Sequence, residues 1–110
     1  MIGPTYVLAK PCALVVDDEL ARPNTAGGRA ARSLVHELRA RDIEVVEATS
    51  IEDGTAVIIS DAAIHCIFLN WNLGKNSATS HEHAMALLRT ARARNDKVPI
   101  FLMAEQHDHD

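Results

Sequence analysis

The sequence is poor in cysteine and has no long hydrophobic run. Its 110 residues include two cysteines, Cys12 and Cys66, which are too few for a disulfide framework and fit free thiols in a cytosolic protein better. No apolar stretch reaches the roughly 18 residues that a membrane span needs. The N-terminus also lacks the basic-then-apolar order of a signal peptide. These absences predict a soluble, cytoplasmic protein with no membrane partner.

Clustered positive charge is also absent. The chain carries 11 Lys and Arg against 15 Asp and Glu, a net charge of -4, and acidic residues are interleaved with the arginines. Binding to nucleic acid needs clustered basic residues, so we expect no nucleic-acid partner. The hydrophobic content of 47% is high enough to build a core, and the length is that of one domain.

Four short apolar runs alternate with three segments of helical spacing. The runs lie at 12–18, 43–48, 64–70 and 98–105, and the helical segments at 29–42, 50–63 and 80–96. Continuous apolar runs suit strands that are buried on both faces, as in a parallel sheet. Because crossovers between parallel strands are right-handed, the order β-α-β-α-β-α-β predicts an open parallel sheet with helices on both faces. We therefore expect a three-layer α/β/α domain with its core at about 12–105.

Three polar residues and one methionine stand at the ends of three of the predicted strands. Asp17 and Asp18 close the first strand, Asn70 closes the third, and Met103 lies at the end of the fourth. Sites in open α/β sheets form outside the carboxyl ends of the strands. These positions are therefore the candidate site.

The acidic pair and the string "VPIFLMA" resemble a response-regulator receiver domain. The resemblance implies a flavodoxin-like (CheY-like) sheet, truncated here to about four strands and three helices. This sequence has Asn70 at the phosphoacceptor position and Met103 in place of the hydroxyl residue, and it ends before a fifth strand could bring a lysine. Since an amide cannot form an acyl phosphate, we expect no phosphorylation switch.

Two interpretations of the acids remain open. Asp17 and Asp18 could hold Mg²⁺ together with Asn70, because hard cations bind clustered oxygens. Alternatively, the two carboxylates are solvated or cap the following loop.

A more specific resemblance lies in "TSIEDGTAVIISDAAIHCIFLNW" and "RARNDKVPIFLMAE". Read with "VVDDE", these strings are similar to the N-terminal domain of the bacterial ornithine/lysine/arginine decarboxylases, enzymes that use pyridoxal phosphate. The resemblance covers about residues 12–105. It implies a non-catalytic wing domain that supports homo-oligomer assembly, with the cofactor and catalysis in a later domain.

From this resemblance we expect residues 1–110 to be a fragment of a longer decarboxylase chain. Arginine is the favoured substrate of that parent enzyme, with lysine or ornithine as alternatives. No catalytic, cofactor-binding or metal residue is expected in the domain itself, because Lys10, Lys75 and Lys97 all lie in predicted loops. The rival interpretation is a free-standing pseudo-receiver that binds a protein partner.

Several other features have a functional and a structural interpretation. Trp71 could anchor an interface or pack over the end of the sheet. The string "NTAGGR" could hold an anion near Arg29, or its glycines could ease a helix start capped by Asn24 or Thr25.

The cysteines and histidines give weaker signals. Cys12 and Cys66 share a face of the sheet in one strand register and not in another; packing is the default role and redox chemistry the alternative. Two histidine pairs, His81 with His83 and His107 with His109, are two residues apart, a spacing that does not suit a zinc site on a helix.

Overall fold

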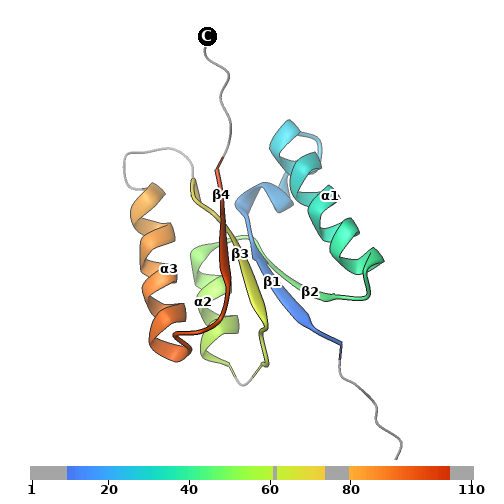
Figure 1. Cartoon of the computed structure of the whole chain (residues 1–110). Helices are drawn as coiled ribbons and strands as arrows, with labels where there is room; N and C mark the ends of the chain where they lie inside the picture. Colours follow the sequence, from blue (N-terminus) through green and yellow to red (C-terminus); the bar gives the residue numbers. More distant parts are fainter. Residues whose placement is uncertain (1–9, 61, 74–79, 105–110) are drawn as a thin grey trace, which may run out of the picture.

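The computed structural model describes residues 10–60, 62–73 and 80–104. Four parallel strands form one sheet in the order β2-β1-β3-β4. Figure 1 shows α1 on one face of this sheet and α2 and α3 on the other. The elements are β1 (Cys12–Val16), the short 3₁₀ helix η1 (Asp18–Ala21), α1 (Ala26–Ala40), β2 (Glu44–Ala48), α2 (Ile51–Ile59), β3 (Cys66–Asn70), α3 (Ser80–Arg94) and β4 (Ile100–Met103). The predicted three-layer, flavodoxin-like architecture is therefore confirmed.

Strand β1 explains why the first apolar run is continuous rather than alternating. Ala13 and Val15 pack into a core cluster on the α1 face, whereas Leu14 and Val16 pack into a second cluster on the face of α2 and α3. All four side chains are fully buried. A strand covered on both faces needs apolar residues at every position, which is the pattern that predicted a parallel sheet.

Helix α1 follows the predicted apolar stripe. Ala31, Val35 and Leu38 are buried against the sheet, and Leu34 is half-buried beside them. Thr25 caps the helix by accepting a hydrogen bond at Oγ1 from the Gly28 N–H, at 2.9 Å. The cap prediction for Thr25 is confirmed, although α1 begins three residues earlier than the apolar spacing indicated.

Helices α2 and α3 cover the other face. Ser50 caps α2 by accepting a hydrogen bond at Oγ from the Asp53 N–H at 3.0 Å. Gly54 lies where α2 passes closest to the sheet, and a Cβ there would meet Val16 and Leu87 at 3.1 Å. Helix α3 begins at Ser80, whose side chain lies outside the described atoms. Ala84, Leu87 and Ala91 of α3 are buried against the sheet, and Leu88 is half-buried.

The ends of the strands differ from the prediction. Strand β1 stops at Val16 because Asp17 caps η1, a helix that the sequence did not predict. Strands β3 and β4 are shorter than the apolar runs that predicted them. Strand β4 forms the edge of the described sheet, next to β3 alone.

Candidate functional site at the carboxyl edge of the sheet

Asp17 is a buried acid at the end of β1, with only 7% of its surface exposed. Its Oδ1 accepts a hydrogen bond from the Glu19 N–H at 2.9 Å, so that Asp17 caps η1. Burial raises the pKa of the Asp17 carboxyl above its ordinary value, the charges of Asp18 and Glu19 raise it further, and the hydrogen bonds from Glu19 and Asn70 lower it in part. Keeping the Asp17 carboxylate ionised in this buried position therefore costs free energy, which its two hydrogen bonds offset in part.

Asn70 is the last residue of β3 and lies directly beside the two acids. Its Nδ2 amide donates to Asp17 Oδ1 at 3.0 Å and to Asp18 Oδ1 at 3.3 Å, while its Oδ1 accepts from the Asn72 N–H at 3.0 Å. The residue is 8% exposed. Asn70 thus points hydrogen-bond donors, rather than an oxygen ligand, at the acids.

Arg22 forms ion pairs with two of the three acids at this edge. Its Nη2 lies 2.9 Å from Asp18 Oδ2, and its Nε lies 3.0 Å from Glu19 Oε1. Glu19 is almost fully buried. Asn70 and Arg22 therefore donate hydrogen bonds to the carboxylate oxygens that a bound cation would contact.

This arrangement holds polar groups in place but offers no reactive one. An amide at position 70 is neither a nucleophile nor a phosphate acceptor, and Met103 is partly buried against the α1-side core. Among the described residues, no group of three or more His, Cys, Asp or Glu side chains could hold a metal ion. The contacts favour Asp17 as the cap of η1 and Asp18 as an ion-pair partner of Arg22, and the Mg²⁺ interpretation stays a prediction that binding measurements decide.

The glycine-containing loop before α1 is filled by the chain itself. Thr25 Oγ1 also donates to the Arg22 carbonyl at 2.9 Å, and the carboxylate of Glu19 lies against Gly27, where an added Cβ would meet Oε2 at 2.8 Å. Arg29, the predicted anion partner, donates instead to the Asn24 carbonyl at 2.8 Å. The negative charge favoured at a helix N-terminus is therefore supplied by Glu19.

The two cysteines lie on different faces of the sheet. Cys66 pairs in register with Ala13, so Cys12 is one position out of step and points to the opposite face. Both are free thiols, and burial raises the pKa of each. Since the thiolate is the reactive form, these thiols stay protonated at neutral pH, in accord with the packing interpretation.

The histidines have separate environments. His65 Nδ1 accepts from the Cys12 N–H at 3.0 Å at the rim of the sheet. His81 Nε2 lies 3.2 Å from Asn72 Oδ1. His83 is exposed on α3, and the pair His107 and His109 lies outside the described residues.

Trp71 packs over the end of the sheet. It is half-buried against the core cluster beneath α2 and α3, and its ring stacks on His81 with centroids 5.1 Å apart. Its backbone N–H donates to the Met103 carbonyl at 2.8 Å and so ties the end of β3 to β4. These contacts give the packing interpretation a structural basis, while the role of Trp71 in an interface stays a prediction.

Replacing this side chain separates the two roles. We expect Trp71→Ala to lower the free energy of unfolding by about 2 kcal/mol, below the 3–5 kcal/mol typical of a fully buried aromatic. Trp71→Phe should recover part of that loss. Urea titrations and sedimentation of the same variants provide the measurement: weaker self-association with an unchanged urea midpoint would instead indicate an interface anchor.

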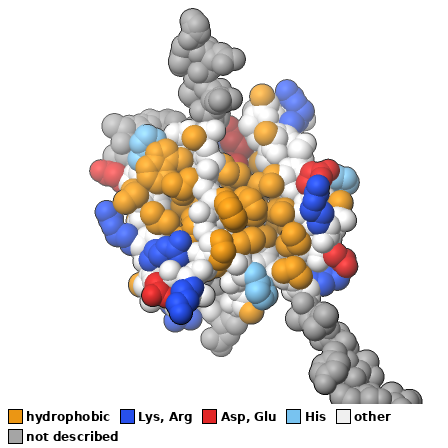
Figure 2. Space-filling model, in the orientation of Figure 1, with side chains coloured by type: hydrophobic (Ala, Val, Ile, Leu, Met, Phe, Trp, Pro, Cys, Tyr) orange, Lys and Arg blue, Asp and Glu red, His pale blue; other side chains and the backbone are white. Residues whose placement is uncertain are grey.

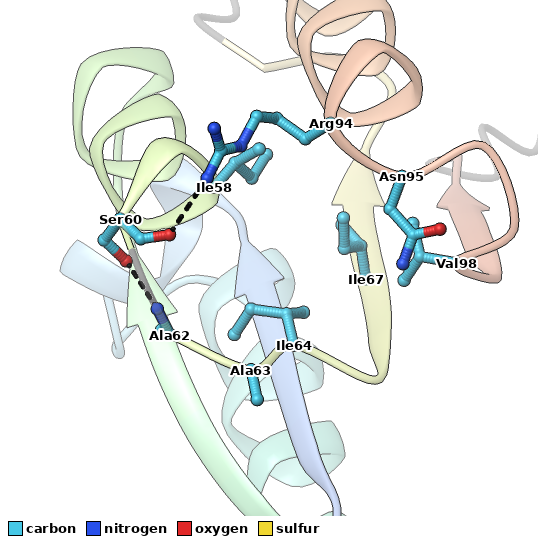
Figure 3. Close-up of a pocket in the computed structure, with 9 residues that line it drawn as sticks. All are labelled: Ile58, Ser60, Ala62, Ala63, Ile64, Ile67, Arg94, Asn95 and Val98. Atoms are coloured by element: carbon cyan, nitrogen blue, oxygen red, sulfur yellow. Dashed lines mark hydrogen bonds between the residues drawn. The ribbon is translucent and has the colours of Figure 1, made fainter.

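A hollow of about 410 Å³ lies at the opposite, amino edge of the sheet (Figure 3). Its floor is apolar, and Ser60, Arg94 and Asn95 stand at its rim. Ser60 Oγ donates to the Val57 carbonyl at 2.6 Å and accepts from the Ala62 N–H at 3.2 Å, so this hydroxyl is already committed. The lining residues are Ile58, Ser60, Ala62, Ala63, Ile64, Ile67, Arg94, Asn95 and Val98. Sequence reasoning missed this hollow because its walls come from two distant stretches of the chain, 58–67 and 94–98.

The parallel sheet, with its acidic carboxyl edge and no phosphoacceptor, defines a receiver-like α/β domain. In agreement, a crystal structure of a response regulator receiver protein from Pseudomonas putida superposes with a TM-score of 0.62 at 24% identity, covering 93% of this chain and 74% of that one. The family model of the Orn/Lys/Arg decarboxylase N-terminal domain matches residues 26–110, and the chain belongs to that family.

A curated relative extends this assignment. The biodegradative arginine decarboxylase of Escherichia coli (strain K12) is 27% identical over 93 residues, which is 84% of this chain. The match spans 12% of the length of that enzyme.

A search for membrane-spanning helices among the described residues found none with the required length and hydrophobicity.

Proposed function

We propose that this chain is the non-catalytic N-terminal domain of a pyridoxal-phosphate-dependent basic amino-acid decarboxylase and contributes to subunit assembly. The match to the decarboxylase N-terminal family over residues 26–110 carries this proposal. Arginine is the favoured substrate of the parent enzyme, because the curated relative is an arginine decarboxylase; lysine and ornithine are the alternatives. The cytoplasm is the proposed location, and the partners are other domains and subunits of the same enzyme.

The lysines that the structure describes do not fit pyridoxal phosphate. The cofactor is held by a lysine that forms a Schiff base in an enclosed pocket. Lys10 is exposed and pairs with Asp42 at 3.2 Å, Lys97 is exposed in the turn before β4, and Lys75 lies outside the described residues. The cofactor and the decarboxylation step therefore belong to another part of the parent chain.

The acidic edge supports a role that acts through surfaces. Its carboxylates accept hydrogen bonds from Asn70 and pair with Arg22, and these contacts join the ends of β1 and β3 to η1. A domain with no nucleophile at position 70 can still position neighbouring subunits through its surface.

The natural protein that carries this domain provides the test. An antiserum raised against the chain should detect a protein several-fold heavier than these 110 residues, and that protein should copurify with pyridoxal-phosphate absorbance and amino-acid decarboxylase activity. A natural protein no heavier than this chain would overturn the proposal. It would favour a free-standing pseudo-receiver, for which the receiver-like fold is the supporting observation.

Assembly is tested separately in the parent enzyme. Deleting the domain should reduce the number of subunits per oligomer, measured by sedimentation and corrected for the deleted mass, while the remaining subunits keep their bound cofactor. An oligomer of unchanged size would contradict the assembly role without affecting the family assignment.

A further inference from the structure

The hollow at the amino edge of the sheet has the size and the apolar floor of a small-ligand site. Its volume of about 410 Å³ falls in the range of roughly 300–1,000 Å³ that is usual for ligand clefts. Ile58, Ile67 and Val98 are buried at its floor, and Ile64 is half-buried beside them. The floor lies over the start of β3, an inner strand with β1 and β4 on its two sides, so the hollow does not depend on an open edge of the sheet. We call this cavity the amino-edge hollow.

Arg94 places a guanidinium over the amino-edge hollow. Figure 3 shows its side chain extending from the end of α3 toward Ser60 at the end of α2. Its Nη2 donates to the Ser60 carbonyl at 3.5 Å, which is longer than the roughly 2.7–3.2 Å of a typical hydrogen bond. No Asp or Glu among the described residues forms an ion pair with Arg94. Because a guanidinium carries several N–H donors in a fork that matches a carboxylate, Arg94 keeps donors for an anionic ligand.

Asn95 adds a second donor to the rim. Its Oδ1 accepts from the Lys97 N–H at 2.9 Å, and its Nδ2 has no hydrogen-bond partner in the part of the chain that the structure describes. None of the described residues that line the hollow is acidic. The side chains at the rim therefore offer N–H donors above an apolar floor, which suits a ligand with an anionic head and an apolar body.

The charge at this end of the molecule also favours an anion. Helices α2 and α3 both end here, and free carbonyls at helix C-termini repel anions. The last turn of α3 offsets this effect with Arg92 and Arg94, and Arg94 contacts the carbonyl of Ser60, which is the C-cap of α2. Figure 2 shows basic side chains gathered over the same end of α3. Residues 89–98 carry three arginines and a lysine against one aspartate, so positive charge predominates beside the hollow.

We propose that the amino-edge hollow binds a small carboxylate with an aliphatic tail. The carboxylate oxygens accept hydrogen bonds from the Arg94 guanidinium and from Asn95 Nδ2, and the tail lies on the apolar floor. A ligand whose tail ends in a charge is excluded, because the floor offers no partner for that charge. Free arginine, the favoured substrate of the proposed parent enzyme, is therefore not expected to bind here. The site goes beyond the assembly role proposed above.

A carboxylate fits this site better than a phosphate. It carries a single negative charge, which one guanidinium can balance, and its flat shape matches the guanidinium fork. A phosphate monoester carries about two negative charges near neutral pH. The second charge would face the carbonyls at the ends of α2 and α3, which repel it.

Titration of the purified 110-residue chain with hexanoate tests the proposal. The backbone amide shifts of Ile64, Ile67 and Val98, followed by NMR on isotope-labelled chain, should saturate. A dissociation constant on the order of 1 mM is expected for so small a ligand. Acetate, which has the same charge and almost no tail to bury, should bind at least about tenfold more weakly. Hexylamine, which has the tail and the opposite charge, and free arginine should give no saturable shift.

The role of the Arg94 guanidinium is tested by substitution. Arg94→Gln should weaken hexanoate binding at least about tenfold, because neutral hydrogen bonds replace charge-assisted ones. Arg89→Gln is the matched control, since Arg89 is exposed on the same helix and does not line the hollow. It should leave the affinity unchanged. Circular dichroism checks that each variant is folded; if Arg94→Gln unfolds, the comparison of hexanoate with hexylamine on the wild-type chain decides.

Several results would overturn the inference. These are the absence of a saturable shift with hexanoate up to tens of millimolar, equal binding of hexylamine, an affinity unchanged in Arg94→Gln, and an equal loss in Arg89→Gln. Tighter binding of hexyl phosphate than of hexanoate would also contradict the carboxylate assignment. None of these results bears on the mass or the cofactor content of the natural protein, so failure here is distinguishable from failure of the proposed function.

Discussion

Substituting Gly28 with alanine is expected to destabilise the chain by about 3 kcal/mol, at the upper end of the range for overpacking. A Cβ on Gly28 would lie 1.8 Å from the Arg22 carbonyl oxygen and 2.9 Å from the Glu19 carbonyl oxygen. Both are backbone atoms, so the clash cannot be relieved by rotating a side chain. The first turn of α1 and η1 would have to separate.

The separation would break bonds that hold the acidic edge together. The Arg22 carbonyl accepts from the Thr25 N–H at 3.2 Å and from Thr25 Oγ1 at 2.9 Å, and Gly28 itself donates to the Thr25 cap. Loss of a helix N-cap alone costs about 1 kcal/mol. The gain in helix propensity from Gly to Ala, also about 1 kcal/mol, is too small to offset the clash and the lost cap together.

Gly27→Ala is the matched control, one position earlier in the same turn. Its added Cβ would meet only side-chain atoms of Glu19, with Oε2 nearest at 2.8 Å. The carboxylate can move by a few tenths of an ångström, and the helix gains the same propensity, so we expect a change within about 1 kcal/mol. Urea titrations of both variants measure the difference. Equal stability of Gly28→Ala and wild type would show that η1 does not pack on α1 as described.

Much of this fold could be predicted from the sequence, because burial on two faces leaves a direct pattern. The continuous run of Ala13 to Val16 indicated a parallel sheet, and the helical stripes of α1 and α3 indicated which side chains meet it. Element ends were less predictable. Helix η1 depends on Asp17 turning its carboxylate onto the Glu19 N–H, a local choice that no periodicity records.

The predicted strand ends indicated which residues lie together at the carboxyl edge of the sheet, but not how those residues contact one another. Sequence position placed Asp17, Asp18 and Asn70 together, which the hydrogen bonds between them confirm. It could not show that Asn70 turns its amide nitrogen, rather than its oxygen, toward the acids. Nor could it show that Glu19 fills the helix start that an anion was considered for. Both depend on side-chain rotamers that respond to neighbours far apart in the chain.

Asn70→Asp is expected to lower the free energy of unfolding at least as much as Gly28→Ala. Unlike Gly28→Ala, this variant should regain stability when a divalent cation is added. At neutral pH and without divalent cations, the variant should lose about 3–5 kcal/mol, the range for leaving a buried charge uncompensated. The substitution removes the donor that now lies 3.0 Å from Asp17 Oδ1 and puts a second carboxylate in its place. Like charges at this separation, in a site less than a tenth exposed, disfavour ionisation of both groups.

The loss should depend on pH in a direction fixed by the wild-type protein. Burial already holds the pKa of Asp17 above its ordinary 3.8, so the folded chain binds this proton more tightly than the unfolded chain. A second carboxylate raises the folded pKa of the pair further. Stability of Asn70→Asp should therefore fall as the pH rises from about 4 toward neutrality, and at pH 4, where one carboxyl keeps a proton to donate, the variant should approach wild type.

Mg²⁺ should restore the stability that Asn70→Asp loses. Three carboxylates at the carboxyl edge would supply the clustered oxygens that a hard cation prefers, and binding to the folded state alone raises its stability. Asn70→Ala is the control: it removes the same donor without adding charge, so it should be destabilised by less, about 2 kcal/mol, and should not respond to Mg²⁺. Equilibrium dialysis at millimolar Mg²⁺ should detect the ion on Asn70→Asp and not on the wild-type chain. Binding by the wild-type chain would mean that Asn70 can turn its amide oxygen toward the acids. The carboxyl edge would then be a cation site, and the hydrogen bonds from Asn70 to Asp17 and Asp18 would not exclude the ion.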